Sequence, residues 1–371
     1  PTKTTSHSVA SSPWKEGKGD VIRELKDACD RHNMKFGIYL SPWDRNAACY
    51  GDSPAYNRFY MEQLTELLTW YGKVDEVWFD GANGEGPDGR RQEYDWQAYY
   101  DLIRKLQPDA VTAIMGEDVR WVGTESGYGR ETEWSATVLA PGGTPESVAI
   151  NEALGIDAMS DDLGSSSLLS RAEHLFWYPA EVDVSIRPGW FWHASEDSLV
   201  KDVEKLADIY LSSVGRNAVL LLNVPPDNRG LITDHDIKSL QGLKAWIDDL
   251  YSTDMLNGAR PYGQGASNLI DGDNSTSWSP HRKRVASFVP AIAATFNTAM
   301  LQEDISRGQR VEKFVIEALS GERWDTIARG TTIGYRRLLR FPEVKADEIR
   351  LTIVSSRATP HISTFALYNA R

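Results

Sequence analysis

Residues 76–84 have the sequence EVWFDGANG, in which a short apolar run ends in a carboxylate, Asp80, that small residues follow. Apolar runs of this length between loops rich in Gly, Pro and Asn are typical of buried strands in a parallel sheet. In a (β/α) barrel the active site lies at the carboxyl ends of the strands, so a polar residue that closes such a strand is a candidate for catalysis. An Asp at this point could also cap the turn after the strand.

The same alternation of helix, apolar run and loop occurs on both sides of this segment, as in successive βα units. The predicted helices are at residues 21–32, 59–71, 96–106 and 200–212. The predicted strands are at residues 35–41, 74–80, 110–116, 182–186 and 218–223. Because a full barrel has about eight strands, we expect an α/β chain with a (β/α)8-like barrel whose first strands precede residue 1.

The pattern changes after about residue 250. Gly, Pro and Asn residues between Ser252 and Gly265 mark a boundary, and short β-type runs alternate with turns from Ala266 onward, as in an all-β sandwich. We therefore predict two domains. Residues 1–250 form a catalytic barrel that is incomplete at its N-terminus, and residues 251–371 form an all-β sandwich of the jelly-roll type.

Composition excludes several classes of function. The 371 residues include 40 Lys and Arg against 53 Asp and Glu, and the resulting net charge of −13 argues against nucleic acid as a partner. No apolar run reaches the roughly twenty residues of a membrane span. Two cysteines, Cys29 and Cys49, build no disulfide framework. The chain opens with neither Met nor an apolar leader, so we expect residues upstream of Pro1, and the localisation is unknown from this chain.

Aromatic residues are abundant, with 13 Trp and 15 Tyr. Their flat faces stack on the apolar faces of sugar rings, while polar neighbours bind the hydroxyls. For most of these residues an ordinary place in the core or on the surface is the simpler expectation. Aromatic residues at predicted strand ends are the exceptions that indicate a sugar site.

Four segments together resemble glycoside hydrolase family 29, the α-L-fucosidases, over about residues 12–230. They are Val77-Trp78-Phe79-Asp80-Gly81, Phe36-Gly37-Ile38-Tyr39-Leu40-Ser41, Ser185-Ile186-Arg187-Pro188-Gly189-Trp190-Phe191, and residues 215–217 running to residues 222–226. The resemblance implies an enzyme that removes fucose from fucosylated oligosaccharides or glycoconjugates without a cofactor. It also implies a secreted or periplasmic protein, and a fucose-binding His-His-Asp-Gly-Phe segment upstream of residue 1.

The resemblance implies that Asp80 is the nucleophile of a retaining mechanism. Such a mechanism needs a second carboxyl group, the acid/base, about 5–5.5 Å from the nucleophile. The stretch from Asp118 to Glu125 resembles the acid/base segment of the branch that cleaves α-1,3- and α-1,4-linked fucose in Lewis-type glycans, although Thr124 replaces its usual Asn. Glu125 is therefore the predicted acid/base and Glu133 the alternative. An inactive carbohydrate-binding protein, and a fucosidase of relaxed or α-1,2 specificity, remain open.

Five further residues are candidates for sugar binding. Tyr39 and Trp78 resemble family positions that contact the sugar, and a second cluster comprises Arg187, Trp190 and Trp192. An Arg there could also lower the pKa of the nucleophile through its charge. No set of His and carboxylate residues has metal-ligand spacing, so we expect no metal in the catalytic site.

The C-terminal region has a resemblance of its own. Residues 266–278, ASNLIDGDNSTSW, resemble the opening of a discoidin-like domain, similar to carbohydrate-binding module family 32. In that fold an Asp-Gly-Asp loop often holds a structural calcium through oxygen ligands, so a calcium ion near Asp271 and Asp273 is a possibility. A solvated turn is the alternative for this loop.

Overall fold

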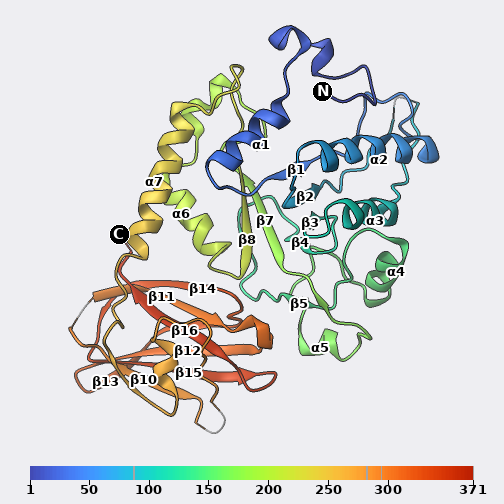
Figure 1. The fold of residues 1–371 in the computed structure, drawn as a ribbon. Helices are drawn as coiled ribbons and strands as arrows, with labels where there is room; N and C mark the ends of the chain where they lie inside the picture. The colour runs from blue at the N-terminus through green and yellow to red at the C-terminus, as the bar shows by residue number, and fades with distance from the viewer. Residues whose placement is uncertain (87, 281–282, 294, 371) are drawn as a thin grey trace. The chain divides into compact units, whose positions relative to one another are not determined.

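The computed structural model describes residues 1–86, 88–280, 283–293 and 295–370 (Figure 1). Its contacts divide the chain into two compact units. The first unit contains Pro1–Trp121 and Leu139–Gly155, and the second contains Val122–Val138 and Ile156–Arg371.

Parallel strands form the centre of the first unit. These are β1 (Gly37–Tyr39), β2 (Glu76–Phe79), β3 (Val111–Ile114) and β4 (Val119–Trp121), and they pair in that order. The helices are α1 (Val21–Arg31), α2 (Ser53–Trp70), α3 (Trp96–Leu106) and α4 (Pro145–Leu154), with short 3-10 turns η1 (Val9–Ser11) and η2 (Trp14–Gly17). Alternation of strand and helix along β1–α2–β2–α3–β3 is the predicted α/β pattern, which is confirmed (Figure 1).

An aspartate starts each of the three longest helices of this unit. Asp20, Asp52 and Asp95 accept hydrogen bonds from backbone N–H groups three residues further on, which satisfies donors that a helix start leaves unpaired. In α3 the buried residues recur at helical spacing, namely Trp96, Tyr99, Tyr100 and Ile103. They pack against the buried face of β2, which fixes α3 against the strand that precedes Asp80.

The second unit begins with a β–α–β element. Strand β7 (Ala180–Ser185) runs parallel to β8 (Ala218–Asn223), and helix α6 (Val203–Ser212) connects them. The other elements before the sandwich are β5 (Ala136–Thr137), β6 (Phe176–Trp177), α5 (Ser166–Leu169), η3 (Ala194–Leu199) and α7 (Asp234–Leu250). Five strands of the barrel type were predicted, and each has a counterpart among β1, β2, β3, β7 and β8. A complete eight-stranded barrel stays a prediction.

Two antiparallel sheets form the rest of the second unit, as predicted for an all-β sandwich. The five-stranded sheet has the order β13-β12-β15-β10-β9, and the three-stranded sheet has the order β14-β11-β16. The strands are β9 (Arg260–Tyr262), β10 (Val285–Val289), β11 (Thr295–Glu303), β12 (Val311–Ser320), β13 (Arg323–Gly330), β14 (Arg337–Lys345), β15 (Glu348–Ser356) and β16 (Ile362–Tyr368). The short turns are η4 (Ala266–Leu269) and η5 (Ile305–Arg307). The jelly-roll connection stays a prediction.

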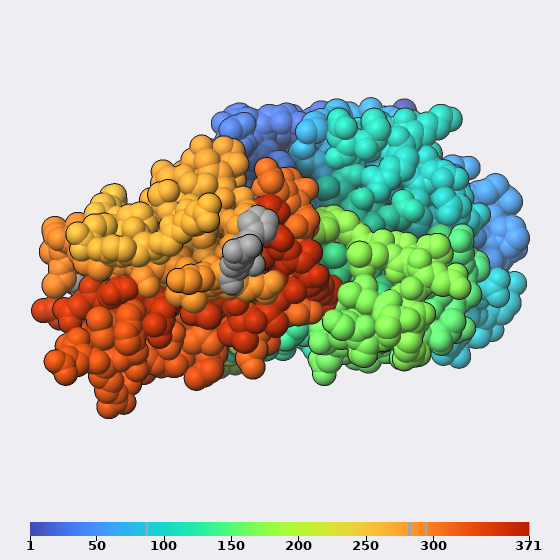
Figure 2. All heavy atoms as spheres, turned by 90° about the horizontal axis from the view of Figure 1, so that it is seen from below, coloured from blue at the N-terminus to red at the C-terminus, as the bar shows by residue number. Residues whose placement is uncertain are grey.

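An apolar cluster fills the sandwich, with buried residues from both sheets such as Phe288, Phe314 and Phe365. On the face seen in Figure 2 the residues of the sandwich, orange to red, form one continuous area of the surface. A second cluster joins the three-stranded sheet to α6 and α7, with Tyr210 and Trp246 packed against buried residues of the sheet. The predicted division between residues 250 and 251 therefore falls inside the second unit, at the end of α7, and stays a prediction.

Among the described residues, no helix combines the length and the apolar character needed to cross a membrane.

Candidate active site

Three of the predicted site residues lie together in the first unit. The parallel register pairs Tyr39 of β1 with Trp78 of β2, and their rings are 5.1 Å apart in an edge-to-face arrangement. Asp80 follows β2 directly, and its Oδ2 accepts a hydrogen bond of 2.7 Å from the hydroxyl of Tyr39. Two neighbouring strand ends thus place the carboxylate of Asp80 beside Tyr39, whose ring packs edge-to-face with Trp78.

Side-chain alternation along β2 explains why Asp80 lies beside Trp78. Successive residues of a strand point to opposite faces, so Trp78 and Asp80 share one face while Phe79 takes the other. Phe79 is completely buried and packs edge-on against Trp96 of α3. Because Phe79 is packed into the core, Trp78 and Asp80 point to the opposite face of β2.

The second oxygen of Asp80 is also engaged. Oδ1 accepts a hydrogen bond of 2.7 Å from the backbone N–H of Ala82, the turn-capping contact that the sequence offered as an alternative to catalysis. The two roles are compatible, because the cap holds one oxygen and Tyr39 holds the other. At Gly81 an added Cβ would lie 3.3 Å from the side chain of Met115, so a small residue suits this turn.

Two tyrosines, buried Tyr50 and partly buried Tyr94, hold the loop after Asp80, and the sequence analysis did not single them out. Tyr94 donates to the carbonyl of Ala82 at 3.1 Å, and Tyr50 donates to the carbonyl of Gly84 at 3.2 Å. The two hydroxyls also lie 2.9 Å apart. Burial raises the pKa of Tyr94 well above its ordinary value, so this hydroxyl stays a neutral donor.

Tyr39 is half exposed, and its phenol has a shifted pKa. Partial burial and the hydrogen bond to Asp80 raise the pKa of Tyr39 to about 12. The phenol therefore keeps its proton at neutral pH and remains a hydrogen-bond donor to the carboxylate of Asp80.

The predicted acid/base lies in the second unit. Glu125 is exposed in the loop that follows residue 122, and its Oε2 accepts a hydrogen bond of 3.3 Å from the indole Nε1 of Trp190. Trp190 belongs to the loop after β7, so these two predicted site residues come from different loops. Gly123 and Gly127 have positive φ angles of 96° and 86°, which side chains other than glycine rarely adopt.

Glu133, the alternative acid/base, lies in a different environment. It is only 2% exposed, and its Oε2 is 3.7 Å from Nη1 of Arg130. Its backbone N–H donates to Thr332, and its carbonyl accepts from Gln309, so the sandwich holds this residue at two points. The contrast in exposure distinguishes Glu125 from Glu133.

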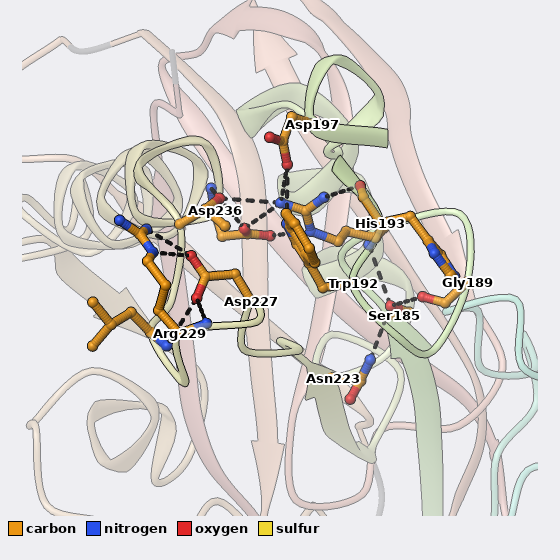
Figure 3. A network of polar contacts seen from close by, with 12 residues as sticks. Ser185, Gly189, Trp192, His193, Asp197, Asn223, Asp227, Arg229 and Asp236 are labelled. Carbon is orange, nitrogen blue, oxygen red and sulfur yellow. Dashed lines mark hydrogen bonds and ion pairs between the residues drawn. The ribbon is translucent and has the colours of Figure 1, made fainter. Parts of the chain in front are cut away.

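Arg187 is completely buried and forms the centre of a polar network, in which its partners Asp197 and Asp236 are labelled in Figure 3. Its guanidinium binds Asp236 at 2.6 Å and Asp197 at 2.9 Å. These hydrogen bonds raise the pKa of Arg187, with Asp236 as the main cause. Trp192 donates from Nε1 to the same Asp197 at 3.3 Å. The network ties the loop after β7 to α7, and a direct contact of Arg187 or Trp192 with a substrate stays a prediction.

The family model for α-L-fucosidase matches residues 2–250. The chain belongs to the α-L-fucosidase family, glycoside hydrolase family 29. α-L-Fucosidase 1 of Arabidopsis thaliana is 38% identical over 99% of this chain and 72% of its own length.

Solved structures of α-L-fucosidase family members have the same fold. A Bacteroides ovatus protein assigned by name to the α-L-fucosidases is 54% identical with a TM-score of 0.92, and the match covers 100% of this chain and 61% of that chain. The chain therefore spans less than two thirds of the length of that relative. A family 29 fucosidase of Ruminococcus gnavus, solved in complex with fucose, is 28% identical with a TM-score of 0.85, over 100% of this chain and 79% of that chain.

In this α-L-fucosidase family member the loop that carries Trp190 has supports that the sequence analysis missed. Asn223, at the end of β8, donates from Nδ2 to the hydroxyl of Ser185 and to the carbonyl of Trp190, both at 3.0 Å. Ser185 donates to the carbonyl of Gly189 at 2.7 Å (Figure 3). Both residues close strands, so the strand-end rule that singled out Asp80 could have found them.

Within the described ranges, no three His, Cys, Asp or Glu side chains form a group that could hold an ion. In the C-terminal loop Asp271 accepts from the hydroxyl of Thr276 at 2.7 Å, and Asp273 accepts from the hydroxyl of Ser275 at 2.6 Å. These donors satisfy the carboxylates as a polar turn would, and a structural calcium ion near them stays a prediction.

Proposed function

We propose that the protein is a retaining exo-α-L-fucosidase in which Asp80 is the nucleophile and Glu125 is the acid/base. The observation that carries the proposal is the position of Asp80 at the end of β2, where Tyr39 donates to one carboxylate oxygen and packs edge-to-face with Trp78. Family membership supplies the substrate class, α-linked fucose. Because the chain spans only part of the Bacteroides ovatus relative, activity is proposed for the protein with its natural N-terminus.

The proposed reaction has two displacement steps. A carboxylate oxygen of Asp80 attacks the anomeric carbon of fucose and the bond to the leaving sugar breaks, while the carboxylic acid of Glu125 gives its proton to the departing oxygen. Glu125, now a carboxylate, then takes a proton from water as that water attacks the fucosyl ester, which frees Asp80. Two inversions give net retention, and this geometry requires about 5–5.5 Å between the two carboxyl groups.

The environments of the residues support these roles. Glu125 is exposed and accepts a hydrogen bond from a neutral donor, Trp190, so it can exchange protons with a leaving group and with water. Glu133 is buried, and the sandwich holds its backbone, which favours a structural role. Tyr39 stays protonated and stabilises the charged form of Asp80 before attack.

The proposed substrates are α-1,3- and α-1,4-linked fucosides of branched, Lewis-type glycans. Exposed aromatic faces at Tyr39 and Trp190 suit stacking on sugar rings, and the segment that ends at Glu125 resembles that branch of the family. In such substrates binding energy from the neighbouring galactose could order the Glu125 loop, which would raise kcat as well as affinity. A sandwich that resembles carbohydrate-binding module family 32 would add a second sugar contact, which is also a proposal.

Hydrolysis of a panel of aryl glycosides tests the activity, and NMR of the first-formed fucose anomer tests retention. The panel should be cleaved at the α-L-fucoside alone, with the α-anomer formed first. Cleavage of no member would favour an inactive carbohydrate-binding protein. A comparison of kcat/KM for a Lewis trisaccharide, an α-1,2-linked trisaccharide and the aryl fucoside tests the linkage, and the Lewis trisaccharide should be the best substrate.

A further inference from the structure

The segment at residues 129–135, which follows the Glu125 loop, is bound along its length by residues far away in the sequence. At its start the N–H of Gly129 donates to the carbonyl of Ser212 at the end of α6, at 2.7 Å. Beyond that point several of its partners come from the C-terminal sandwich. Contacts in the described chain accordingly place Val122–Val138 in the same compact unit as the sandwich.

Gln309 binds the backbone of this segment at two points. Its Nε2 donates to the carbonyl of Glu133 and its Oε1 accepts from the N–H of Ser135, both at 2.8 Å. One side-chain amide thus binds a donor and an acceptor two residues apart, as a neighbouring β-strand would. Gln309 is 5% exposed, so water cannot readily replace it.

Arg337 binds the preceding turn of the segment. Its Nη1 donates to the carbonyl of Glu131 at 2.7 Å, and its Nη2 forms an ion pair with the carboxylate of the same residue. Arg337 is 1% exposed, and burial lowers its pKa although the charge of Glu131 opposes this. Thr332 adds a hydrogen bond of 3.0 Å to the N–H of Glu133.

The Gly-Arg-Asn motif at residues 215–217 lies at the same contact between the sandwich and the segment at residues 129–135. Asn217 has a left-handed φ of 63°, and its side chain donates to Ser135 at 3.1 Å and accepts from the N–H of Tyr335 at 2.7 Å. At Gly215 an added Cβ would lie 2.2 Å from the carbonyl of Leu211 and 2.8 Å from Leu338 of the sandwich. The motif is therefore needed for close packing between the sandwich and the start of β8.

The loop that carries Glu125 also has an anchor on its other side. The N–H of Val122 donates to the carbonyl of Glu181 in β7 at 2.9 Å. Between the two anchors Gly127 lies against Ile209 of α6, where an added Cβ would be only 3.1 Å away. The residues of the loop are thus confined between β7 and the segment that the sandwich holds.

We infer that the C-terminal sandwich positions the acid/base loop, with Gln309 as a positioning residue that holds residues 133 and 135 and thereby sets the place of Glu125. This inference rests on the proposed function for its kinetic consequence. Its structural part, that Gln309 restrains the loop, is independent of which residue gives the proton. The sandwich would then serve the chemical step in addition to any sugar that it binds.

The test is Gln309→Ala in the full-length protein, with aryl fucosides of graded leaving-group pKa. A displaced acid matters most when the leaving group needs a proton, so kcat/KM should fall about ten-fold for poor leaving groups and by less than about three-fold for the best one. Hydrogen exchange of a peptide covering residues 122–135 should accelerate in the same variant. A merely structural role would lower stability without changing the leaving-group dependence.

Asn297→Ala is the matched control. The amide of Asn297 makes the same kind of two-point contact elsewhere in the sandwich, with the carbonyl of Ala370 at 2.7 Å and its N–H at 2.9 Å. This variant should lose comparable stability while the leaving-group dependence and exchange of residues 122–135 stay as in the wild type. Equal changes in both variants, or neither change in Gln309→Ala, would overturn the inference. Hydrogen exchange could accelerate in Gln309→Ala while Glu125→Ala keeps the leaving-group dependence of the wild type. That outcome would support the claim that Gln309 restrains the loop, and it would reject only the assignment of Glu125 as the acid/base.

Discussion

The hydroxyl of Tyr39 lies 2.7 Å from Oδ2 of Asp80 and donates its proton to that carboxylate. The two residues end neighbouring parallel strands and are 41 positions apart in the sequence. A donor of this kind stabilises the charged carboxylate and also fixes its orientation, two conditions that a nucleophile needs before it attacks.

Tyr39→Phe removes this donor while the ring remains. A hydrogen bond to a charged group contributes about 1.5–3 kcal/mol, so kcat/KM for an aryl fucoside should fall about 10- to 100-fold. The alkaline limb of the pH–rate profile should stay where it is, because a phenol with a pKa of about 12 does not titrate in the working range. A shifted alkaline limb would show that Tyr39 itself exchanges a proton during the reaction.

Asp80→Asn should abolish turnover of an aryl fucoside, because an amide cannot form the ester intermediate. Loss of a catalytic group costs about 10⁴-fold or more in kcat. Asp75→Asn is a suitable comparison, since Asp75 precedes β2 and binds the N–H of Phe36 at 3.0 Å and Lys73 at 2.8 Å. The Asp75 variant should keep most of its kcat. A folded Asp80→Asn protein with near-wild-type kcat would rule out Asp80 as the nucleophile.

Glu125→Ala should lose most activity on substrates with poor leaving groups and least on activated aryl fucosides. Added azide should restore part of the rate, because azide attacks the fucosyl-enzyme without a general base. Glu133→Ala should instead lower stability, since it removes a buried carboxylate beside Arg130. Azide rescue in the Glu133 variant, without rescue in the Glu125 variant, would exchange the two assignments.

Glu303 gives the sandwich a pH-dependent stability. Complete burial raises its pKa to about 7, although hydrogen bonds from the N–H groups of Gly334, Arg310 and Val311 oppose the shift. Because the folded-state pKa lies above the unfolded value, its contribution to the free energy of unfolding is present at acidic pH and is lost as pH rises through about 7.

Urea unfolding of the wild type and of Glu303→Gln over this range measures the effect. The wild type should lose on the order of 3 kcal/mol of unfolding free energy between the unfolded and folded pKa values. Glu303→Gln cannot ionise, so its unfolding free energy should be nearly flat over the same interval. An equal slope in both proteins would assign the pH dependence to other groups.

The sequence predicted those parts of the fold and the candidate site that depend on local patterns. Apolar runs located strands β1 and β2, the strand-end rule then selected Asp80, and the family resemblance added Tyr39 and Trp78. The parallel register pairs Tyr39 with Trp78, and Tyr39 donates to Asp80. The buried face of β2 follows from the same alternation, since Phe79 on that face packs against Trp96 of α3.

Partners that lie far apart in the sequence could not be predicted in this way. The network of Arg187 depends on Asp236, 49 positions downstream in α7, and no spacing rule connects the two residues. Gln309 binds a segment 176 positions upstream, and its two hydrogen bonds depend on how the sandwich packs. Such contacts are set by tertiary structure, which periodicity does not encode.

The apolar cluster shared by α6, α7 and the three-stranded sheet limits where this chain can be cut or joined to part of another family member. Tyr210 and Trp246 cover Leu338 and Tyr368, so a fragment that stops after α7 would expose an apolar surface that the intact chain buries. An exchange of the sandwich between family members would have to carry matching helix faces with it. In a hybrid protein the segment to exchange as one piece is therefore the sandwich together with α6, α7 and the loop of Glu125.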